Sequence, residues 1–214
     1  MHFVDRQDAG EKLAKVLMKY RGDDTVVYAL PRGGVVVGFQ VAHALQAPLD
    51  CIIARKIGHP ANPEYAVCAV TEAGTLLCDE SERALLDHDW FAQAVARERQ
   101  EAVRRRKLYL GGKPHISAKN RRAILVDDGV ATGLTMRSAV QSLRNEQPRE
   151  LIVACPVAPH EVLETLRQEA DAVIALEDAR DYLGAVGAYY DDFPQVADDE
   201  VIHLLRQSRR SPYP

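Results

Sequence analysis

The run ILVDDGVATGLT, residues 124–135, decides the fold of this chain. An apolar stretch ends in two consecutive acids, Asp127 and Asp128, and a turn rich in glycine and threonine follows. Residues 133–146 then carry apolar side chains at helical spacing. A strand, a turn and a helix in this order are typical of parallel α/β proteins, whose ligands bind at the carboxyl ends of the strands. The run therefore predicts both a fold class and the position of a functional site.

Segments downstream of this run continue the alternation. Residues 151–157 and 171–177 are short apolar runs that indicate strands. Residues 160–170 between them indicate a helix, with Pro159 in its first turn. The order strand, helix, strand, helix, strand over residues 123–177 predicts a parallel sheet with right-handed crossovers.

The other segments are assigned by the same periodicities. We predict helices over residues 8–21, 34–46, 82–109 and 198–208, strands over 25–30 and 47–56, a loop over 58–64, and two short strands around Ala73-Gly74. This order extends the α/β pattern toward both ends of the chain.

Composition bounds the class of protein. The 214 residues are 47% hydrophobic and 27% charged, which suits a chain with one large core and excludes a disordered or collagen-like protein. A formal net charge of −4 implies no general attraction for nucleic acid. No apolar run reaches the roughly 20 residues of a membrane span, and the N-terminus has no signal-peptide core. We therefore expect a cytoplasmic protein without a membrane partner.

The four cysteines are scattered singly along the chain, at Cys51, Cys68, Cys78 and Cys155. None belongs to a CxxC pair, and all but Cys51 lie inside apolar runs. We expect reduced, packed thiols, and neither a disulfide framework nor a metal site.

The turn after the two acids has the chemistry of an anion site. Backbone N–H groups in such a turn, together with the start of the next helix, attract phosphate. Thr132 and Thr135 add hydroxyl donors, while Asp127 and Asp128 suit neutral sugar hydroxyls or a hydrated divalent cation. A sugar phosphate offers a phosphate for the N–H groups of the turn and hydroxyls for the two acids. The alternative is a strand-end turn with a helix N-cap and no ligand.

The same run resembles the phosphoribosyl-pyrophosphate (PRPP) binding motif of type I phosphoribosyltransferases, except that Ala131 stands where many members have threonine. The resemblance implies an α/β fold: a parallel-sheet core with helices on both faces and a smaller hood subdomain. It implies that Asp127 and Asp128 are catalytic, hold the ribose hydroxyls and contact Mg²⁺ indirectly. The 5′-phosphate would be bound by Gly129, Val130, Ala131, Thr132, Gly133 and Thr135.

Two further segments are similar to the same family. The segment LPRGG corresponds to the pyrophosphate loop, which implies that Arg32, Gly33 and Gly34 contact the pyrophosphate. Arg55 and Lys56 resemble the basic pair that begins the mobile catalytic loop of adenine phosphoribosyltransferases, and a catalytic role is implied for them. The alternatives are an ordinary strand–helix turn and a solvated basic pair.

The segment AVGAYYDDF, residues 185–193, resembles a loop of hypoxanthine-type enzymes that lies beside the acceptor. The resemblance implies that Tyr189, Tyr190 and Asp191 line an acceptor pocket. There an aromatic ring would stack a heterocycle and a carboxylate would accept its hydrogen bonds. The alternative is that Tyr190 and Phe193 anchor the tail on the core.

Two charged segments are interpreted as structural. Residues 97–107, RERQEAVRRRK, hold six basic and two acidic side chains with no aromatic residue interleaved beside the bases. We expect a solvated helix face there, and a nucleic-acid-binding regulator is the weaker alternative. Asp87, His88 and Asp89 are adjacent, so on a helix they point in different directions. This favours a loop or N-cap over a metal cluster.

These features together predict one phosphoribosyltransferase domain over residues 1–214, with a core over about 8–78 and 120–177 and a hood over about 79–119 and 178–214. With PRPP and Mg²⁺ it would transfer the 5-phosphoribosyl group to a nitrogen acceptor, which we expect to be a nucleobase, and release pyrophosphate. The resemblance also implies a homodimer. The alternative from a different class is a regulatory protein of this fold that senses PRPP or nucleotides without turnover.

Overall fold

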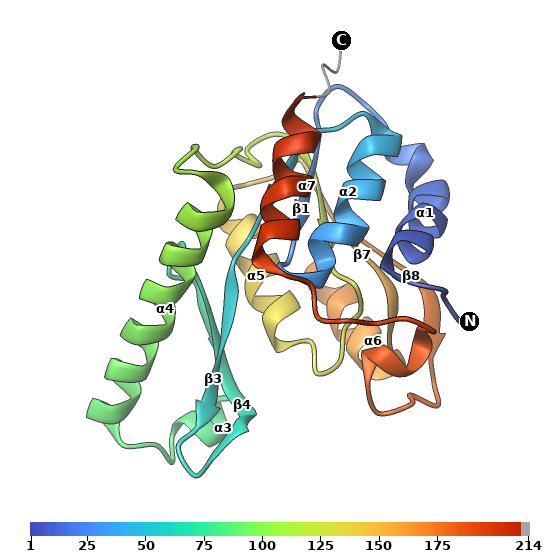
Figure 1. The fold of residues 1–214 in the computed structure, drawn as a ribbon. Coiled ribbons are helices and arrows are strands. Elements are labelled where there is room, and N and C mark those ends of the chain that lie inside the picture. Colours follow the sequence, from blue (N-terminus) through green and yellow to red (C-terminus); the bar gives the residue numbers. More distant parts are fainter. Residues whose placement is uncertain (211–214) are drawn as a thin grey trace.

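A five-stranded parallel sheet forms the centre of the computed structural model, which describes residues 1–210 (Figure 1). The strands pair in the order β2-β1-β6-β7-β8 and all run parallel. Their bounds are Thr25–Ala29 for β1, Leu49–Cys51 for β2, Arg122–Val126 for β6, Glu150–Pro159 for β7 and Ala172–Ala179 for β8. The sequence prediction of a parallel α/β core is confirmed.

Helices cover both faces of this sheet because successive strand residues point to opposite sides. Val27 and Ala29 of β1 pack in the cluster that contains α1, α2 and α7, whereas Val26 and Tyr28 pack with α5 and α6. The helix bounds are Arg6–Leu17 for α1, Gly33–Leu45 for α2, Leu134–Asn145 for α5, His160–Glu169 for α6 and Asp198–Arg210 for α7. Two short 3-10 turns, Met18–Tyr20 and Val186–Tyr189, complete this part of the chain.

The register of β1 and β6 brings two loops together at the carboxyl edge of the sheet. Ala29 lies opposite Val126, and the N–H of Leu30 donates to the carbonyl of Val126 over 2.9 Å. The loop that follows β1 and the two acids that follow β6 therefore leave the sheet side by side.

A second, antiparallel sheet projects from the core and packs against a long helix (Figure 1). It contains β3 (Ala54–His59), β4 (Asn62–Thr71) and β5 (Leu76–Cys78). The short helix α3 (Glu80–Arg83) and the long helix α4 (His88–Leu110) follow. Ile57, Val67 and Val70 of the sheet pack with Ala94 of α4 in a separate small apolar cluster.

Three predictions for this region are wrong. Residues 47–56 are not one strand, because Leu49–Cys51 joins the parallel sheet and Ala54–His59 joins the antiparallel one. Residues 58–64 are not a loop, since His59 pairs with Asn62 and the two strands form a hairpin. The helix over 82–109 is interrupted before His88, where the Asp87 carboxylate caps α4 by accepting from the Trp90 N–H over 2.8 Å.

The expectation of four reduced thiols is also wrong. Cys68 and Cys78 form a disulfide, because the antiparallel register of β4 and β5 places them directly opposite each other. Cys51 and Cys155 are free and buried, and burial raises the pKa of both thiols. Among the residues that the structure describes, no helix is long and apolar enough to cross a membrane.

Candidate functional site

The acid pair lies at the carboxyl end of β6, in the middle of the parallel sheet. The N–H of Asp128 donates to Oδ1 of Asp127 over 2.8 Å. Burial and then the neighbouring charge of Asp128 raise the pKa of Asp127 well above its ordinary value. A half-buried acid with a raised pKa beside a second acid is typical of functional sites.

Two side chains from distant parts of the sequence hold Asp128. Nε of Arg6, in the first turn of α1, donates to Oδ2 of Asp128 over 2.6 Å. The hydroxyl of Tyr190 donates to the backbone carbonyl of Asp128 over 2.5 Å. These two contacts fix both the carboxylate and the backbone of Asp128.

The turn after the acids leads into the start of α5. Gly133 precedes this helix with a φ of 80°, in the left-handed region that glycine adopts without a steric penalty. It offers no capping side chain, and the first turn of α5 contains no acid. The start of α5 is therefore suited to an external anion. Of the other predicted phosphate contacts, Gly129 and Val130 are buried, Thr135 is half-buried, and Ala131 and Thr132 are exposed.

The glycine loop after β1 lies directly against the acid pair. A Cβ atom on Gly33 would lie 1.8 Å from Oδ2 of Asp128, and one on Gly34 would lie 2.8 Å from Oδ1 of Asp127. Because a side chain at either position would collide with a carboxylate, glycine is what allows this approach. The fold thus brings the predicted pyrophosphate loop and the predicted ribose contacts together.

Arg32 lies at the start of α2, immediately before these glycines, and its side chain is half-buried. Its Nη1 is 3.8 Å from Oδ1 of Asp198 at the start of α7. The same Asp198 oxygen accepts a 2.7 Å hydrogen bond from the Tyr109 hydroxyl. The ion pair of Arg32 is therefore long, and its partner is held by another group.

Arg55 and Lys56 lie on β3 of the projecting sheet and not at the start of a mobile loop. Nε and Nη2 of Arg55 both donate to Oε2 of Glu98 on α4, over 3.1 and 2.8 Å, and Lys56 is exposed. Among the described residues, no hydrogen bond or ion pair joins this basic pair to the acids after β6. The structure therefore does not bring Arg55 and Lys56 into direct contact with the acid pair.

The aromatic segment after β8 packs inward. Tyr189 and Tyr190 are 4% and 6% exposed, and both lie in an apolar cluster with Phe3. The Tyr189 hydroxyl accepts a hydrogen bond from the Leu183 N–H over 3.0 Å. Asp191 is exposed and contacts His2. This geometry favours anchoring of the tail over stacking of an acceptor by either tyrosine.

Comparison with known proteins identifies the family. The family model described as the phosphoribosyl transferase domain matches residues 5–192. The chain belongs to the phosphoribosyltransferase family. This match includes the acid pair, the glycine loop and Arg6.

Two relatives and one solved structure that are similar to this chain agree with that result. Two proteins of Mycobacterium tuberculosis, from the strains CDC 1551 / Oshkosh and ATCC 25618 / H37Rv, carry the name "Putative phosphoribosyl transferase" and are each 37% identical over 210 residues. That alignment covers 97% of this chain and 47% of each relative, so the chain spans about half their length. The crystal structure of TT1426 from Thermus thermophilus is 41% identical and has a TM-score of 0.82, with 97% of this chain and 99% of that chain covered.

The donor set beside the acid pair suits a divalent cation only through water or substrate oxygens. No group of three or more His, Cys, Asp or Glu side chains that could hold a metal ion occurs among the described residues. Arg6 already occupies Oδ2 of Asp128. The two carboxyl groups, of which that of Asp128 already accepts a hydrogen bond from Arg6, fit a hydrated Mg²⁺. This ion keeps several waters and takes its other ligands from phosphates.

The basic run on α4 is only partly the solvated face that we expected. Arg106 is mostly buried and pairs with Asp50 and Glu72, each over 3.1 Å. His115 contacts the same Asp50 and Glu146, and these acids raise its pKa to about 9 against the opposing effect of burial. This network joins α4 to the edge of the parallel sheet, which is a structural role.

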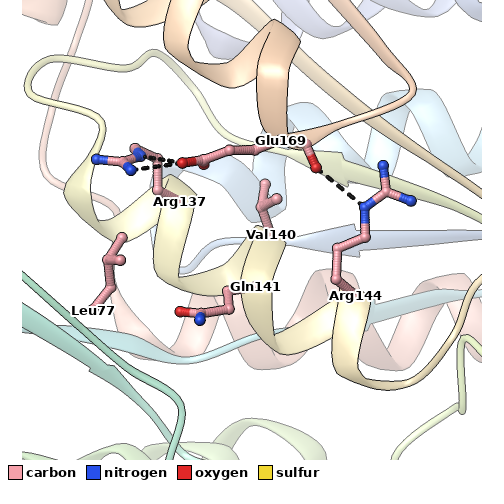
Figure 2. Close-up of a pocket in the computed structure, with 6 residues that line it drawn as sticks. All are labelled: Leu77, Arg137, Val140, Gln141, Arg144 and Glu169. Atoms are coloured by element: carbon pink, nitrogen blue, oxygen red, sulfur yellow. Dashed lines mark hydrogen bonds and ion pairs between the residues drawn. The ribbon is translucent and has the colours of Figure 1, made fainter.

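A separate cavity of about 250 Å³ lies between α5, the end of α6 and Leu77 of β5. Figure 2 shows the residues that line it. Arg137 and Arg144 extend from α5 toward Glu169 at the end of α6 (Figure 2). Nε of Arg137 donates to the Glu169 carboxylate over 2.8 Å, and Nε of Arg144 donates to its backbone carbonyl over 3.1 Å. None of the predicted site residues lines this cavity.

Sequence reasoning missed Arg6 as a neighbour of the acid pair. Arg6 precedes Asp128 by 122 positions and stands before the helix predicted over residues 8–21, whereas α1 begins at Arg6. The partial signal was its position, because few arginines open a helix whose first turn favours acids.

Proposed function

We propose that this chain transfers the 5-phosphoribosyl group of PRPP to a nitrogen acceptor, in the first place a nucleobase, and releases pyrophosphate. The observation that carries the proposal is the contact between the Gly33-Gly34 loop and the Asp127-Asp128 pair. A phosphate-binding turn, two carboxyl groups and a glycine loop at one sheet edge match the three parts of PRPP: the 5′-phosphate, the ribose and the pyrophosphate.

Each part of the site takes one part of the substrate. The turn from Gly129 to Thr135 binds the 5′-phosphate through backbone N–H groups and the start of α5. Asp127 and Asp128 accept hydrogen bonds from the ribose hydroxyls. Arg32 and the two following glycines bind the pyrophosphate, because a guanidinium group matches phosphate oxygens in a bidentate manner.

Catalysis is then mainly electrostatic. As the bond from C1 to the pyrophosphate lengthens, positive charge builds on the ribose ring and negative charge on the leaving group. The carboxyl groups of the acid pair stabilise the ring, while Arg32 stabilises the leaving group. Mg²⁺, when bound, neutralises charge on the pyrophosphate.

We also propose a role for the projecting sheet that follows from its position. Lys56 is exposed there, and no ion pair among the described residues would have to break before it contacted a bound pyrophosphate. Arg55 would have to leave Glu98 to do so. The pair thus divides into a candidate substrate contact, Lys56, and a residue that holds the sheet to α4, Arg55.

The test is pyrophosphate release from PRPP and Mg²⁺ in the presence of a mixture of nucleobases. We expect release by the wild-type chain and loss of most of it in the double variant Asp127→Asn, Asp128→Asn. The matched control is Asp23→Asn, Asp24→Asn, another adjacent acid pair, which precedes β1. Retention of wild-type release by the first variant would contradict the site.

The yield separates turnover from sensing. More than one equivalent of pyrophosphate per chain favours the transferase. Binding of PRPP with no release for any nucleobase favours the regulatory alternative.

A further inference from the structure

Arg6 makes three different contacts at the edge of the acid pair. Its Nε donates to Oδ2 of Asp128 over 2.6 Å, and its Nη1 donates to the backbone carbonyl of Pro194 over 2.7 Å. Its guanidinium carbon lies 3.6 Å from the centroid of the Phe193 ring. The residue is 9% exposed, so one guanidinium group, nearly removed from water, joins α1, the acid pair and the segment before α7.

The glycine loop touches the same group. A Cβ atom on Gly33 would lie 2.7 Å from Nε of Arg6 as well as 1.8 Å from Asp128. The ion pair is therefore packed closely on the side of the glycine loop. A carboxylate with a guanidinium group on one oxygen, and with packed neighbours, has few alternative orientations.

The charge of Arg6 also acts on the second acid. It opposes the burial and the Asp128 charge that raise the pKa of Asp127. Two further ionisable groups interact with Asp127, the Cys155 thiol on β7 and the Tyr190 hydroxyl; burial raises the pKa of both, so they stay neutral. Arg6 is thus the cationic group that counters the two adjacent carboxyl groups.

We propose that Arg6 is a positioning residue for the ribose site: it holds Oδ2 of Asp128 so that Oδ1 is presented to a ribose hydroxyl. This inference rests on the proposed function. Arg6 acts through Asp128 and does not touch the pyrophosphate. It also connects the ribose site to the segment from Phe193 to Pro194, so that substrate binding and the placement of this segment depend on each other.

The test measures binding of two ligands, PRPP with Mg²⁺ and ribose 5-phosphate, by calorimetry at pH 7. For Arg6→Gln we expect both ligands to bind at least tenfold more weakly, and by the same factor, because both carry the same ribose hydroxyls. Arg6→Lys keeps the positive charge beside Asp128 and should recover part of both affinities, again by the same factor.

Arg122 provides a closely matched control at the other end of β6. Its Nε donates to Glu150 over 2.6 Å, its Nη1 donates to the Tyr20 carbonyl over 3.2 Å, and its guanidinium group lies over the Tyr20 ring. Arg122→Gln removes the same three kinds of contact far along the strand from the acids. It should lower the melting temperature and leave both affinities unchanged.

The outcomes are distinct. Wild-type affinities for both ligands in folded Arg6→Gln overturn the inference, and so does an equal effect of Arg122→Gln. A larger loss for PRPP than for ribose 5-phosphate overturns it too, because Arg6 would then contact the pyrophosphate. If Arg6→Gln does not fold, Arg6→Lys decides: the inference requires an equal weakening of both ligands there. Absence of PRPP binding by the wild-type chain overturns the proposed function, and this inference with it.

Discussion

Replacement of Gly33 by alanine tests the packing of the site most sharply. The added Cβ would lie 1.8 Å from Oδ2 and 2.5 Å from Cγ of Asp128, and 2.7 Å from Nε of Arg6. Real Cβ atoms essentially never approach another heavy atom within 3.0 Å, so the Asp128 carboxylate must move by more than 1 Å. That movement separates it from Arg6, to which it is bound over 2.6 Å.

The size of the effect follows from this displacement. A misplacement of about 1 Å in a binding constellation costs roughly 100-fold in function. Overpacking of a filled site costs about 1–3 kcal/mol of stability. We therefore expect Gly33→Ala to weaken PRPP binding by about 100-fold and to lower the free energy of unfolding by an amount in that range.

Calorimetric titration with PRPP and Mg²⁺ and denaturant unfolding provide the two measurements. The control is Gly22→Ala, where a Cβ would meet ordinary contacts of 3.5 Å or longer. Unchanged PRPP affinity in folded Gly33→Ala would refute the reasoning, because the loop and the acids could not then be packed as described. If that variant does not fold, Gly34→Ala, with a milder 2.8 Å approach to Asp127, should show a smaller loss of PRPP affinity.

Three further results are expected. Asp127→Asn should melt at a higher temperature than the wild type at pH 7 to 8. Burial raises the pKa of this acid, so the stability of the wild type falls as the pH rises above the ordinary carboxyl range. The difference in melting temperature should vanish near pH 4. Replacement of both Cys68 and Cys78 by alanine should lower the free energy of unfolding by about 3 kcal/mol in denaturant without reductant, because their disulfide closes a loop with a sequence separation of 10. Equal stability of the wild type and this double variant would contradict the disulfide. Replacement of Arg32 or Lys56 by alanine should weaken PRPP binding by about 1.5–3 kcal/mol and ribose 5-phosphate binding much less, and equal losses in calorimetry would argue against a pyrophosphate contact.

The parallel core was predictable because its signals are local. Apolar runs such as residues 123–126 are buried on both faces, and the glycine at position 133 adopts the left-handed conformation from which α5 begins. Periodicity, turn chemistry and strand order therefore agree along this part of the chain.

The projecting sheet was not predictable in the same way. No glycine, proline or polar residue separates Cys51 from Ala54, yet the chain changes sheet between them, and this change depends on partners distant in sequence. The register that brings Cys68 opposite Cys78 is equally non-local. Pro60 and Asn62 indicated a loop, but they lie at the tip of a hairpin whose strands continue on either side.

The same difference between local and non-local signals applies to the residues of the candidate site. The two acids and the glycine loop are visible in the sequence, because each follows a strand and contains the residue types that its chemistry needs. Arg6 and Tyr190 reach Asp128 only through tertiary packing, at sequence separations of 122 and 62. The burial of Tyr189 likewise depends on its contacts with the N-terminal segment.

A crystal structure with a PRPP analogue, Mg²⁺ and a mixture of purines and pyrimidines tests the central claim most directly. We predict the 5′-phosphate in the turn over residues 129–135, the ribose hydroxyls at Asp127 and Asp128, and the pyrophosphate at the loop that contains Arg32. An analogue bound elsewhere, for example in the cavity beside Arg137 and Glu169, with the acid pair free of ligand, would contradict the account.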